Sequence, residues 1–193
     1  RIVVLVVGET VRAANWGLSG YARQTTPKLA QLPVVNFNKT TSCGTNTETS
    51  VPCMFAPVGR RDYDEDKIRG SEGLLQVLAR AGVDVTWRDN QSGCKGVCDG
   101  LPNELVADKP PAGLCDKGRC FDEALLAGLD ERLKNAKGTQ LLVLHMLGNH
   151  GPSYFRRYPP AFDKFQPACQ SDDRRQCSDD QIANADDHAL LHA

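Results

Sequence analysis

A hydroxyl-rich segment between two cysteines is the part of the sequence best suited to covalent chemistry. Residues 41–53 read Thr-Ser-Cys-Gly-Thr-Asn-Thr-Glu-Thr-Ser-Val-Pro-Cys. The sequence predicts a helix beginning near Thr45 to Thr47, and the free N–H groups and dipole of such a helix would favour a phosphoryl group on a first-turn hydroxyl. An alcohol is a weak nucleophile unless a base or a metal activates it. Most of these hydroxyls are expected to be ordinary caps or exposed polar groups.

Further polar residues follow predicted strands, and ligands bind beyond the carboxyl ends of strands in parallel sheets. Glu9 comes after the apolar run Ile2–Val7, so it is placed to hold a metal; the alternative is that it only caps a loop or pairs with Arg12. His145 and His150 bracket the end of a later strand. We expect His145 to be a core residue and His150, in an exposed turn, to meet substrate or metal.

Lys95 lies between Cys94 and Cys98 in a loop rich in glycine and charge. A lysine is a compact point charge that can pair with a phosphate. The alternative is an ordinary solvated loop lysine.

The eight cysteines fall into four pairs of neighbours along the sequence. The predicted disulfides are Cys43 with Cys53, Cys94 with Cys98, Cys115 with Cys120, and Cys169 with Cys177. A structural zinc site made by the four middle cysteines is the alternative, but their spacings are looser than is usual for zinc. Four disulfides indicate an oxidising compartment outside the cytosol.

Strand and helix patterns alternate along the chain. Predicted strands cover Ile2–Val7, Val83–Trp87 and Gln140–His145, and the first is expected to be buried on both faces of a sheet. Predicted helices run from Thr26 to Leu32, from a Ser71 cap to a stop at Gly82, from Leu125 past Leu133 with Lys134 and Lys137 near the end, and from a capping box at Ser178–Gln181 to the end. Residues 90–120 are expected to be ordered by disulfides rather than by core burial. This alternation of strands and helices predicts an α/β fold with a mostly parallel sheet flanked by helices.

Composition sets outer limits on function. The 193 residues include 23 Lys plus Arg and 24 Asp plus Glu, for a formal net charge of −1, so nucleic-acid binding is disfavoured. A single domain of residues 1–193 is the expected organisation. No apolar run reaches the roughly 18 residues of a membrane span. The sequence begins on a strand and stops inside a predicted helix, so both ends are expected to be cut.

Seven motifs, in order along nearly the whole chain, resemble the phosphoethanolamine transferases that modify lipid A, the family of the mobile colistin-resistance enzymes. They are Val7–Ala13, Gly20–Tyr21, Ser42–Thr47, Ser50–Phe55, Trp87–Asn90, Lys95–Val97 and His145–Pro152. The cysteine-bracketed threonine segment together with Gly-Asn-His-Gly-Pro is the most specific combination.

The resemblance implies an alkaline-phosphatase-like fold facing the periplasm, attached to the bacterial inner membrane through a segment absent here. It implies that Glu9 and Thr47 bind Zn2+, that Thr47 is the nucleophile, and that Lys95 and His150 recognise the phosphoryl group or its ethanolamine ester. Thr47 would take phosphoethanolamine from phosphatidylethanolamine and pass it to a lipid A phosphate, a reaction associated with polymyxin and colistin resistance.

Members of that family carry an Asp-His-Gly-Glu motif and a later histidine that complete the zinc site, and this sequence lacks them. His188 and His192 do not match those ligands. The chain is therefore expected to be the N-terminal portion of a catalytic domain, and the fragment alone is expected to bind zinc poorly. The rival functions are another phosphotransferase or hydrolase of the alkaline phosphatase superfamily and a non-catalytic domain of the same fold. A sulfatase is disfavoured, because Cys43 is followed by Gly44-Thr45-Asn46 rather than by a Pro and Arg signature.

Overall fold

The computed structural model describes residues 1–192 and divides into two compact units. Unit 1 contains residues 1–7 and 41–146, and unit 2 contains residues 8–40 and 147–193. A single catalytic domain spanning the whole chain stays a prediction.

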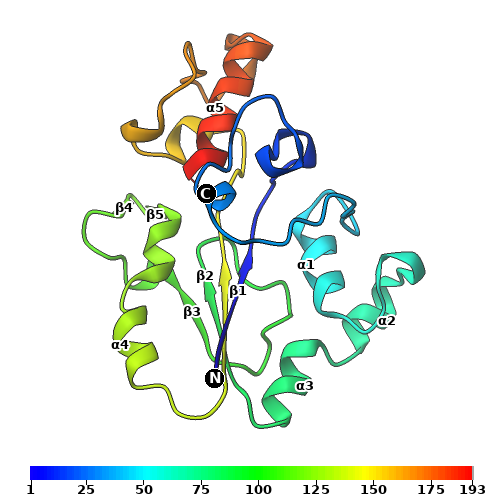
Figure 1. Cartoon of the computed structure of the whole chain (residues 1–193). Helices are drawn as coiled ribbons and strands as arrows, with labels where there is room; N and C mark the ends of the chain where they lie inside the picture. The colour runs from blue at the N-terminus through cyan, green and yellow to red at the C-terminus, as the bar shows by residue number, and fades with distance from the viewer. Residues whose placement is uncertain (193) are drawn as a thin grey trace. The chain divides into compact units, whose positions relative to one another are not determined.

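Unit 1 is built on a four-stranded parallel sheet with the strand order β1-β6-β2-β3 (Figure 1). The strands are β1 (Ile2–Val7), β2 (Asp84–Asp89), β3 (Asn103–Leu105) and β6 (Gln140–His145). The register pairs His145 with Val7 on one side and with Asp89 on the other. The carboxyl ends of these three strands therefore meet at one edge of the sheet, where parallel α/β proteins bind ligands.

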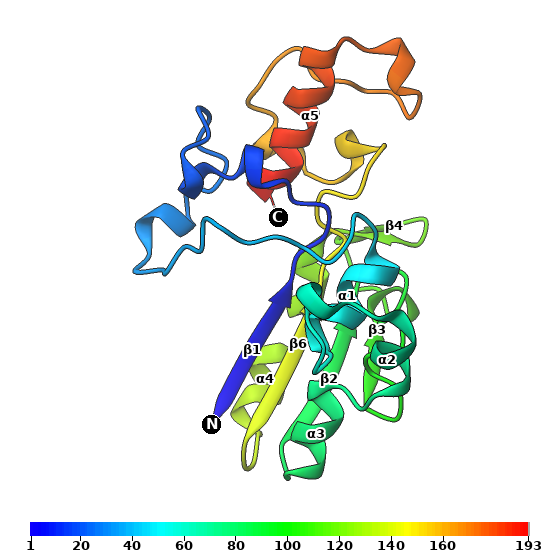
Figure 2. The same ribbon diagram turned by 90° about the vertical axis from the view of Figure 1, so that its right-hand side faces the viewer.

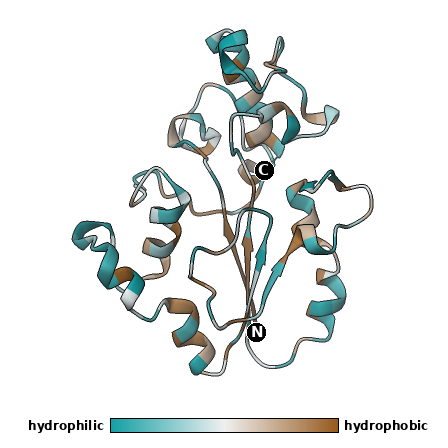
Figure 3. Cartoon of the chain, turned by 180° about the vertical axis from the view of Figure 1, so that it is seen from behind, coloured by the Kyte–Doolittle hydropathy of each residue, from teal (hydrophilic) through white to brown (hydrophobic). Residues whose placement is uncertain are grey.

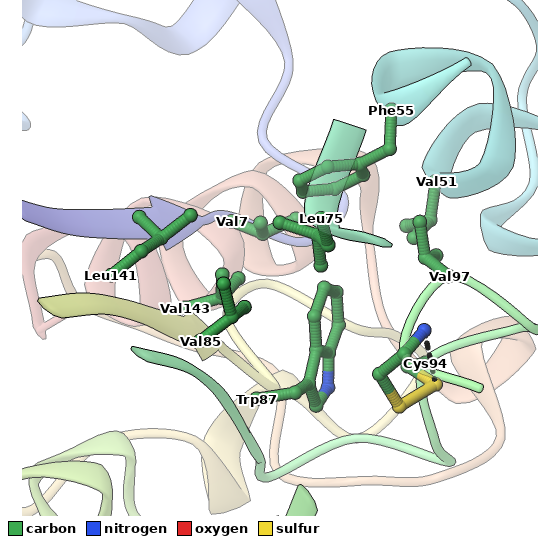
Figure 4. Close-up of a cluster of buried hydrophobic side chains, with 11 residues drawn as sticks. Val7, Val51, Phe55, Leu75, Val85, Trp87, Cys94, Val97, Leu141 and Val143 are labelled. Carbon is green, nitrogen blue, oxygen red and sulfur yellow. Dashed lines mark hydrogen bonds between the residues drawn. A yellow bond between two sulfur atoms is a disulfide. The ribbon is translucent and has the colours of Figure 1, made fainter. Parts of the chain in front are cut away.

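Helices cover both faces of this sheet (Figure 2). One face carries α1 (Thr47–Phe55), α2 (Glu65–Gly70) and α3 (Leu74–Arg80), and the other carries α4 (Leu129–Lys134). The central strand β6 alternates between two apolar clusters: Leu141 and Val143 pack with residues of α1 and α3 (Figure 4), while Leu142 and Leu144 pack with residues of the α4 side. This alternation is the period of two that a strand imposes on its side chains.

The expectation that Ile2–Val7 is buried on both faces is wrong. Within the described residues β1 pairs only with β6, and its residues 2–6 are exposed, from 38% at Leu5 to 54% at Val6. The strand buried on both faces is β6, in which all six residues are buried. Both strands are strongly hydrophobic, as the brown strands of Figure 3 illustrate, so their sequences alone could not show which one is central.

Residues 90–120 are held by more than cross-links, which corrects a second expectation. Val97 and Val106 are buried and belong to the two apolar clusters of unit 1. The segment also adds β3 to the sheet and forms a small antiparallel pair, β4 (Cys115–Asp116) with β5 (Arg119–Cys120). Core burial and disulfides therefore order this excursion together.

Three predicted helices differ in detail from the observed ones. The helix expected over Thr26–Leu32 is reduced to a 3₁₀ turn at Leu29–Gln31. α3 is capped by Gly73 rather than Ser71. The helix expected over Leu125–Leu133 is split into a 3₁₀ helix (Asp122–Leu126) and α4, because the chain turns at Gly128, whose φ of 72° is the left-handed conformation that glycine tolerates best.

Unit 2 contains one long helix, α5 (Asp179–His192), and its other described elements are short 3₁₀ turns. The predicted capping box is confirmed: the Gln181 N–H donates to the Ser178 hydroxyl at 3.3 Å, and the Ser178 N–H donates to the Gln181 side-chain oxygen at 2.8 Å. Ala185 of α5 packs against the segment around Cys169. Among the described residues, no helix is both long and apolar enough to cross a membrane.

All four predicted disulfides are confirmed, and no cysteine is free. They join Cys43 to Cys53, Cys94 to Cys98, Cys115 to Cys120, and Cys169 to Cys177. A zinc site made from the middle four cysteines is therefore excluded, because a disulfide sulfur is not a thiolate ligand.

Candidate active site

The hydroxyl-rich segment forms the start of α1, as its sequence predicts. Thr47 is the first residue of the helix, and the Asn46 side chain caps it by accepting a hydrogen bond from the Thr49 N–H at 2.8 Å. The Cys43–Cys53 disulfide joins the preceding loop to the second half of α1. The Thr47 side chain thus belongs to the first turn, where backbone N–H groups and the helix dipole favour a phosphoryl group.

Gly44 lets the loop before α1 approach the helix closely. A Cβ atom at this position would lie 2.7 Å from the Thr49 methyl carbon. The Gly44 carbonyl accepts hydrogen bonds from the Ser42 and Ser50 hydroxyls, each at 2.8 Å. The Ser42 and Ser50 hydroxyls therefore have structural roles, as was expected for most hydroxyls of this segment.

Lys95 is held in one place by three contacts within unit 1. Its ammonium donates to the carbonyl and the hydroxyl of Ser92 at 3.0 and 2.8 Å, and it pairs with the Glu48 carboxylate at 3.1 Å. Only 12% of the side chain is exposed, so the alternative of a solvated loop lysine is wrong. Since Glu48 directly follows Thr47, this pair places Lys95 beside the start of α1.

A buried carboxylate, Asp89, anchors the loop that leads to Lys95. One oxygen accepts a hydrogen bond from the Trp87 indole and contacts His145 Nδ1, both at 2.8 Å. The other accepts from the N–H groups of Gln91 at 2.8 Å and Gly93 at 3.1 Å. Burial raises the pKa of the Asp89 carboxyl, but the hydrogen bonds from His145, Trp87 and Gly93 outweigh it and hold the pKa below its usual value.

His145 is a core residue, as predicted, with none of its surface exposed. Because the ionised Asp89 can only accept, the Nδ1 atom of His145 carries the proton in this contact. Its Nε2 atom is buried and has no hydrogen-bond partner among the described residues. The ring also packs edge-on against Trp87, with centroids 5.3 Å apart.

In unit 2, Glu9 lies against the turn that carries His150. The Asn149 N–H donates to the Glu9 carbonyl at 3.0 Å. Gly148 has a φ of 50°, and a Cβ there would lie 2.7 Å from the same carbonyl oxygen, so only glycine allows this approach. The Thr10 hydroxyl donates to the Glu9 carboxylate. The turn and the Glu9 segment therefore form one compact arrangement.

The same turn is fastened to α5, and His150 itself is exposed. The Asn149 side chain donates to the Asp186 carboxylate at 2.8 Å. His150 Nδ1 lies 2.9 Å from the Gly151 carbonyl, and the Arg157 guanidinium donates to the His150 carbonyl at 2.9 Å. His150 is thus an accessible imidazole on a fixed turn.

The four predicted site residues fall into two pairs. Thr47 and Lys95 are linked through Glu48 in unit 1, and Glu9 and His150 are linked through Asn149 in unit 2. The convergence of Glu9 with Thr47 in one coordination sphere would join the two units, and it stays a prediction.

Glu48 and Asp89 are site residues that were not predicted from the sequence. Asp89 follows the apolar part of a predicted strand, the same kind of position that drew attention to Glu9, so this signal was present. No sequence pattern pointed to Glu48, because its partner Lys95 lies 47 positions away along the chain.

The residues present fit only part of a zinc site. The Glu9 carboxylate and the Thr47 hydroxyl offer oxygen donors, whereas catalytic zinc usually has three protein ligands. Within residues 1–192, no group of three or more His, Cys, Asp or Glu side chains could hold a metal ion. The zinc prediction therefore depends on ligands outside the described residues.

The fold and this site define a class of protein that comparison with known families confirms. The Sulfatase family profile matches residues 1–189, and the chain belongs to this family. A protein of the alkaline phosphatase superfamily from Vibrio parahaemolyticus shares the fold, with a TM-score of 0.63 at 17% identity over 98% of this chain and 48% of that chain. The predicted α/β fold with a parallel sheet flanked by helices is confirmed.

Within this class, the chain is similar to phosphoethanolamine transferases, which confirms the resemblance seen in its motifs. Phosphoethanolamine transferase EptA of Salmonella typhimurium is 45% identical over 100% of this chain and 35% of that protein. Phosphatidylethanolamine transferase Mcr-1 of Escherichia coli is 44% identical over 99% of this chain and 37% of that protein. The integral membrane lipooligosaccharide phosphoethanolamine transferase A of Neisseria meningitidis superposes with a TM-score of 0.95 at 47% identity, over 100% of this chain and 36% of that chain.

This chain spans about a third of the length of the curated relatives it matches. More distantly, the periplasmic domain of EptC from Escherichia coli, solved in complex with Zn, has a TM-score of 0.78 at 22% identity, covering 100% of this chain and 56% of that chain. At this identity the likeness shows the fold, and the zinc is a property of that protein.

Proposed function

We propose that this chain is part of the catalytic domain of a lipid A phosphoethanolamine transferase. The observation that carries the proposal is the position of Thr47 at the first residue of a capped and disulfide-braced helix, with Lys95 beside it. Such a helix start binds phosphoryl oxygens, and a fixed lysine adds a positive charge. The names of similar proteins support phosphatidylethanolamine as the donor.

The proposed reaction has two transfers. In the first, the Thr47 oxygen bonds to the phosphorus of phosphatidylethanolamine, the bond from phosphorus to the glycerol oxygen breaks, and diacylglycerol leaves with the proton. In the second, a phosphate oxygen of lipid A attacks the same phosphorus, the bond from phosphorus to Thr47 breaks, and Thr47 regains its hydroxyl with the proton that the lipid A phosphate releases. The first-turn N–H groups of α1 hold the phosphoryl oxygens, Lys95 offsets their charge, and His150 contacts the ester from its turn.

Zinc is the proposed cofactor, with Glu9 and the Thr47 oxygen as two of its ligands. When bound, zinc would act as a Lewis acid and lower the pKa of the threonine hydroxyl, so that it could attack as an alkoxide. Its remaining ligands would come from outside the described residues.

The proposed location is the periplasmic face of the bacterial inner membrane, with the membrane segment outside this chain. Two observations support it: all eight cysteines form disulfides, which persist in oxidising compartments, and a similar protein is an integral membrane protein. Polymyxin and colistin resistance belongs to the same proposal, because an added ethanolamine ammonium reduces the negative charge of lipid A.

The test is mass spectrometry of the full-length protein incubated with phosphatidylethanolamine. A phosphoethanolamine adduct on Thr47 is expected, and Thr47→Ala should abolish both the adduct and transfer to lipid A. Thr45→Ala is the matched control, because Thr45 is an exposed hydroxyl outside the helix. An adduct on Thr45 or Thr49, or full activity in Thr47→Ala, would refute the assignment.

A non-catalytic domain is the second candidate, because the described residues hold no complete metal cluster. Zinc analysis of the full-length protein separates the two. Stoichiometric zinc lost in Glu9→Gln supports the transferase, whereas a zinc-free protein that forms no Thr47 adduct supports the non-catalytic domain.

A further inference from the structure

Glu48 is an exposed carboxylate positioned beside both predicted phosphoryl-binding groups. It directly follows Thr47 in α1, and its carboxylate lies 3.1 Å from the Lys95 ammonium. Its side chain is 61% exposed, whereas that of Lys95 is 12% exposed. Lys95 therefore approaches from the protein interior, and Glu48 meets it from the solvent side.

The charges around this pair are balanced. The Arg69 guanidinium lies 2.9 Å from the Glu65 carboxylate and 4.0 Å from the Glu48 carboxylate. Two acids and two bases thus form a row with no net charge. Lys95 and Arg69 also line a cavity of about 360 Å³, but Glu48 is not part of its lining, so Glu48 faces solvent rather than this cavity.

A neutral row of this kind suits a ligand that is itself a zwitterion. The phosphoethanolamine head group carries one negative phosphoryl group and one positive ammonium. If its phosphoryl oxygen pairs with Lys95 and its ammonium with Glu48, one ion pair is exchanged for two, and no charge is left uncompensated. A phosphoglycerol head group has no ammonium, so it would leave the Glu48 carboxylate next to an additional negative charge.

The helix geometry separates the Glu48 side chain from the nucleophile. Consecutive residues of an α-helix point about 100° apart. Glu48 is therefore directed to the side of the position where Thr47 would bond to phosphorus.

We propose that Lys95 and Glu48 together form the head-group subsite, in which Glu48 binds the ethanolamine ammonium and selects zwitterionic donors over anionic ones. This inference rests on the proposed transferase function and adds a specificity-determining residue to it.

The test compares two lipid donors in the full-length enzyme, phosphatidylethanolamine and phosphatidylglycerol, in detergent micelles with lipid A as acceptor. Glu48→Gln should lower kcat/KM for phosphatidylethanolamine by about tenfold, mostly through KM, because one charge-assisted contact is lost. Transfer from phosphatidylglycerol should stay the same or rise. Glu48→Asp should restore part of the preference, since it keeps the charge on a shorter arm.

Glu131→Gln is the matched control, because Glu131 is also an exposed first-turn glutamate paired with a lysine, Lys134, at 3.4 Å. Glu131→Gln should leave kcat/KM unchanged for both donor lipids. Calorimetric binding of glycerophosphoethanolamine and glycerophosphoglycerol to the same variants provides a readout independent of turnover.

Two outcomes would overturn the inference alone: an equal loss for both donors in Glu48→Gln, which would mean that Glu48 only orients Lys95, or an unchanged KM for phosphatidylethanolamine. Wild-type protein that transfers nothing from phosphatidylethanolamine would instead overturn the proposed function, and this inference with it.

Discussion

Asp89 in unit 1 and Asp187 in unit 2 are both buried carboxylates, but they organise different kinds of structure. Asp89 ends a strand and receives two backbone N–H groups along with two side chains. Asp187 lies on α5 and receives only side chains: Asn15 at 2.9 Å, Tyr21 at 2.9 Å and Arg23 at 2.8 Å. Unit 1 already has a sheet, so its carboxylate fixes a loop, whereas the described part of unit 2 has no strand and relies on polar side chains to hold residues 15–23 to a helix.

A neighbouring carboxylate in unit 2 sharpens the contrast. Burial raises the pKa of Asp186, and the Arg12 guanidinium at 3.3 Å, which is largely exposed, offsets this only in part. The pKa of Asp89 is instead lowered, because its hydrogen bonds outweigh its burial. Burial therefore prevails at Asp186, where the charge of Asp187 also raises the pKa, whereas hydrogen bonds prevail at Asp89.

The largest effect is expected from Asp187→Ala. The substitution leaves Arg23 without its buried acceptor and removes a partner from Asn15 and Tyr21, so unit 2 should lose about 4 kcal/mol of stability. Thermal unfolding of the full-length protein and hydrogen exchange of α5 would measure the loss. Asp187→Asn retains an acceptor and should cost less. Unchanged protection of α5 in the alanine variant would contradict the idea that polar contacts hold unit 2 together.

Asp89→Asn should cost about 2 kcal/mol, less than the change in unit 2, because the sheet and its apolar clusters remain. An amide has one acceptor oxygen, so one side of Asp89 would present an NH2 group to existing donors. Hydrogen exchange should increase mainly at Gln91 and Gly93. Equal loosening throughout β2 would show that Asp89 holds the strand and not only its loop.

The contributions of Asp186 and Asp89 to the free energy of unfolding should change with pH in opposite directions. The pKa of Asp186 is raised in the folded protein, so the folded state binds the carboxyl proton more tightly than the unfolded state does. The stability gained from this proton is lost as pH rises above 3.8, the ordinary pKa of an aspartate. The lowered pKa at Asp89 gives stability that is lost as pH falls below 3.8. The penalty of Asp186→Asn should thus shrink between about pH 3 and about pH 7, whereas that of Asp89→Asn should grow. If urea unfolding shows the stability penalties of both variants changing with pH in the same direction, the proposed difference is disproved.

The smallest effect is expected at an exposed pair. Lys134→Gln removes the contact with Glu131 at 3.4 Å, where both side chains are at least 70% exposed. Solvent screens such pairs, so stability should change by about 0.3 kcal/mol or less. A loss above about 1 kcal/mol in thermal unfolding would mean that exposed charges matter as much here as the buried carboxylates.

Much of the fold and of the candidate site followed from local patterns in the sequence. The strand Gln140–His145, the start of α1 near Thr47, the Ser178 capping box and the four disulfides were all predicted and are all present. Each depends on residues no more than about a dozen positions apart, whose spacing directly fixes the hydrogen bond or cross-link.

The tertiary structure decided the features that join distant segments. Ile2–Val7 and Gln140–His145 are similarly apolar, and only the pairing of the strands made the second one central. In the same way, the contact of His145 with Asp89 arises because β6 and β2 end side by side, and the contact of Lys95 with Glu48 joins the loop after β2 to the start of α1. A sequence specifies which residues can pair, but strand order and helix packing determine which of them meet, because those depend on burying apolar surface over the whole unit.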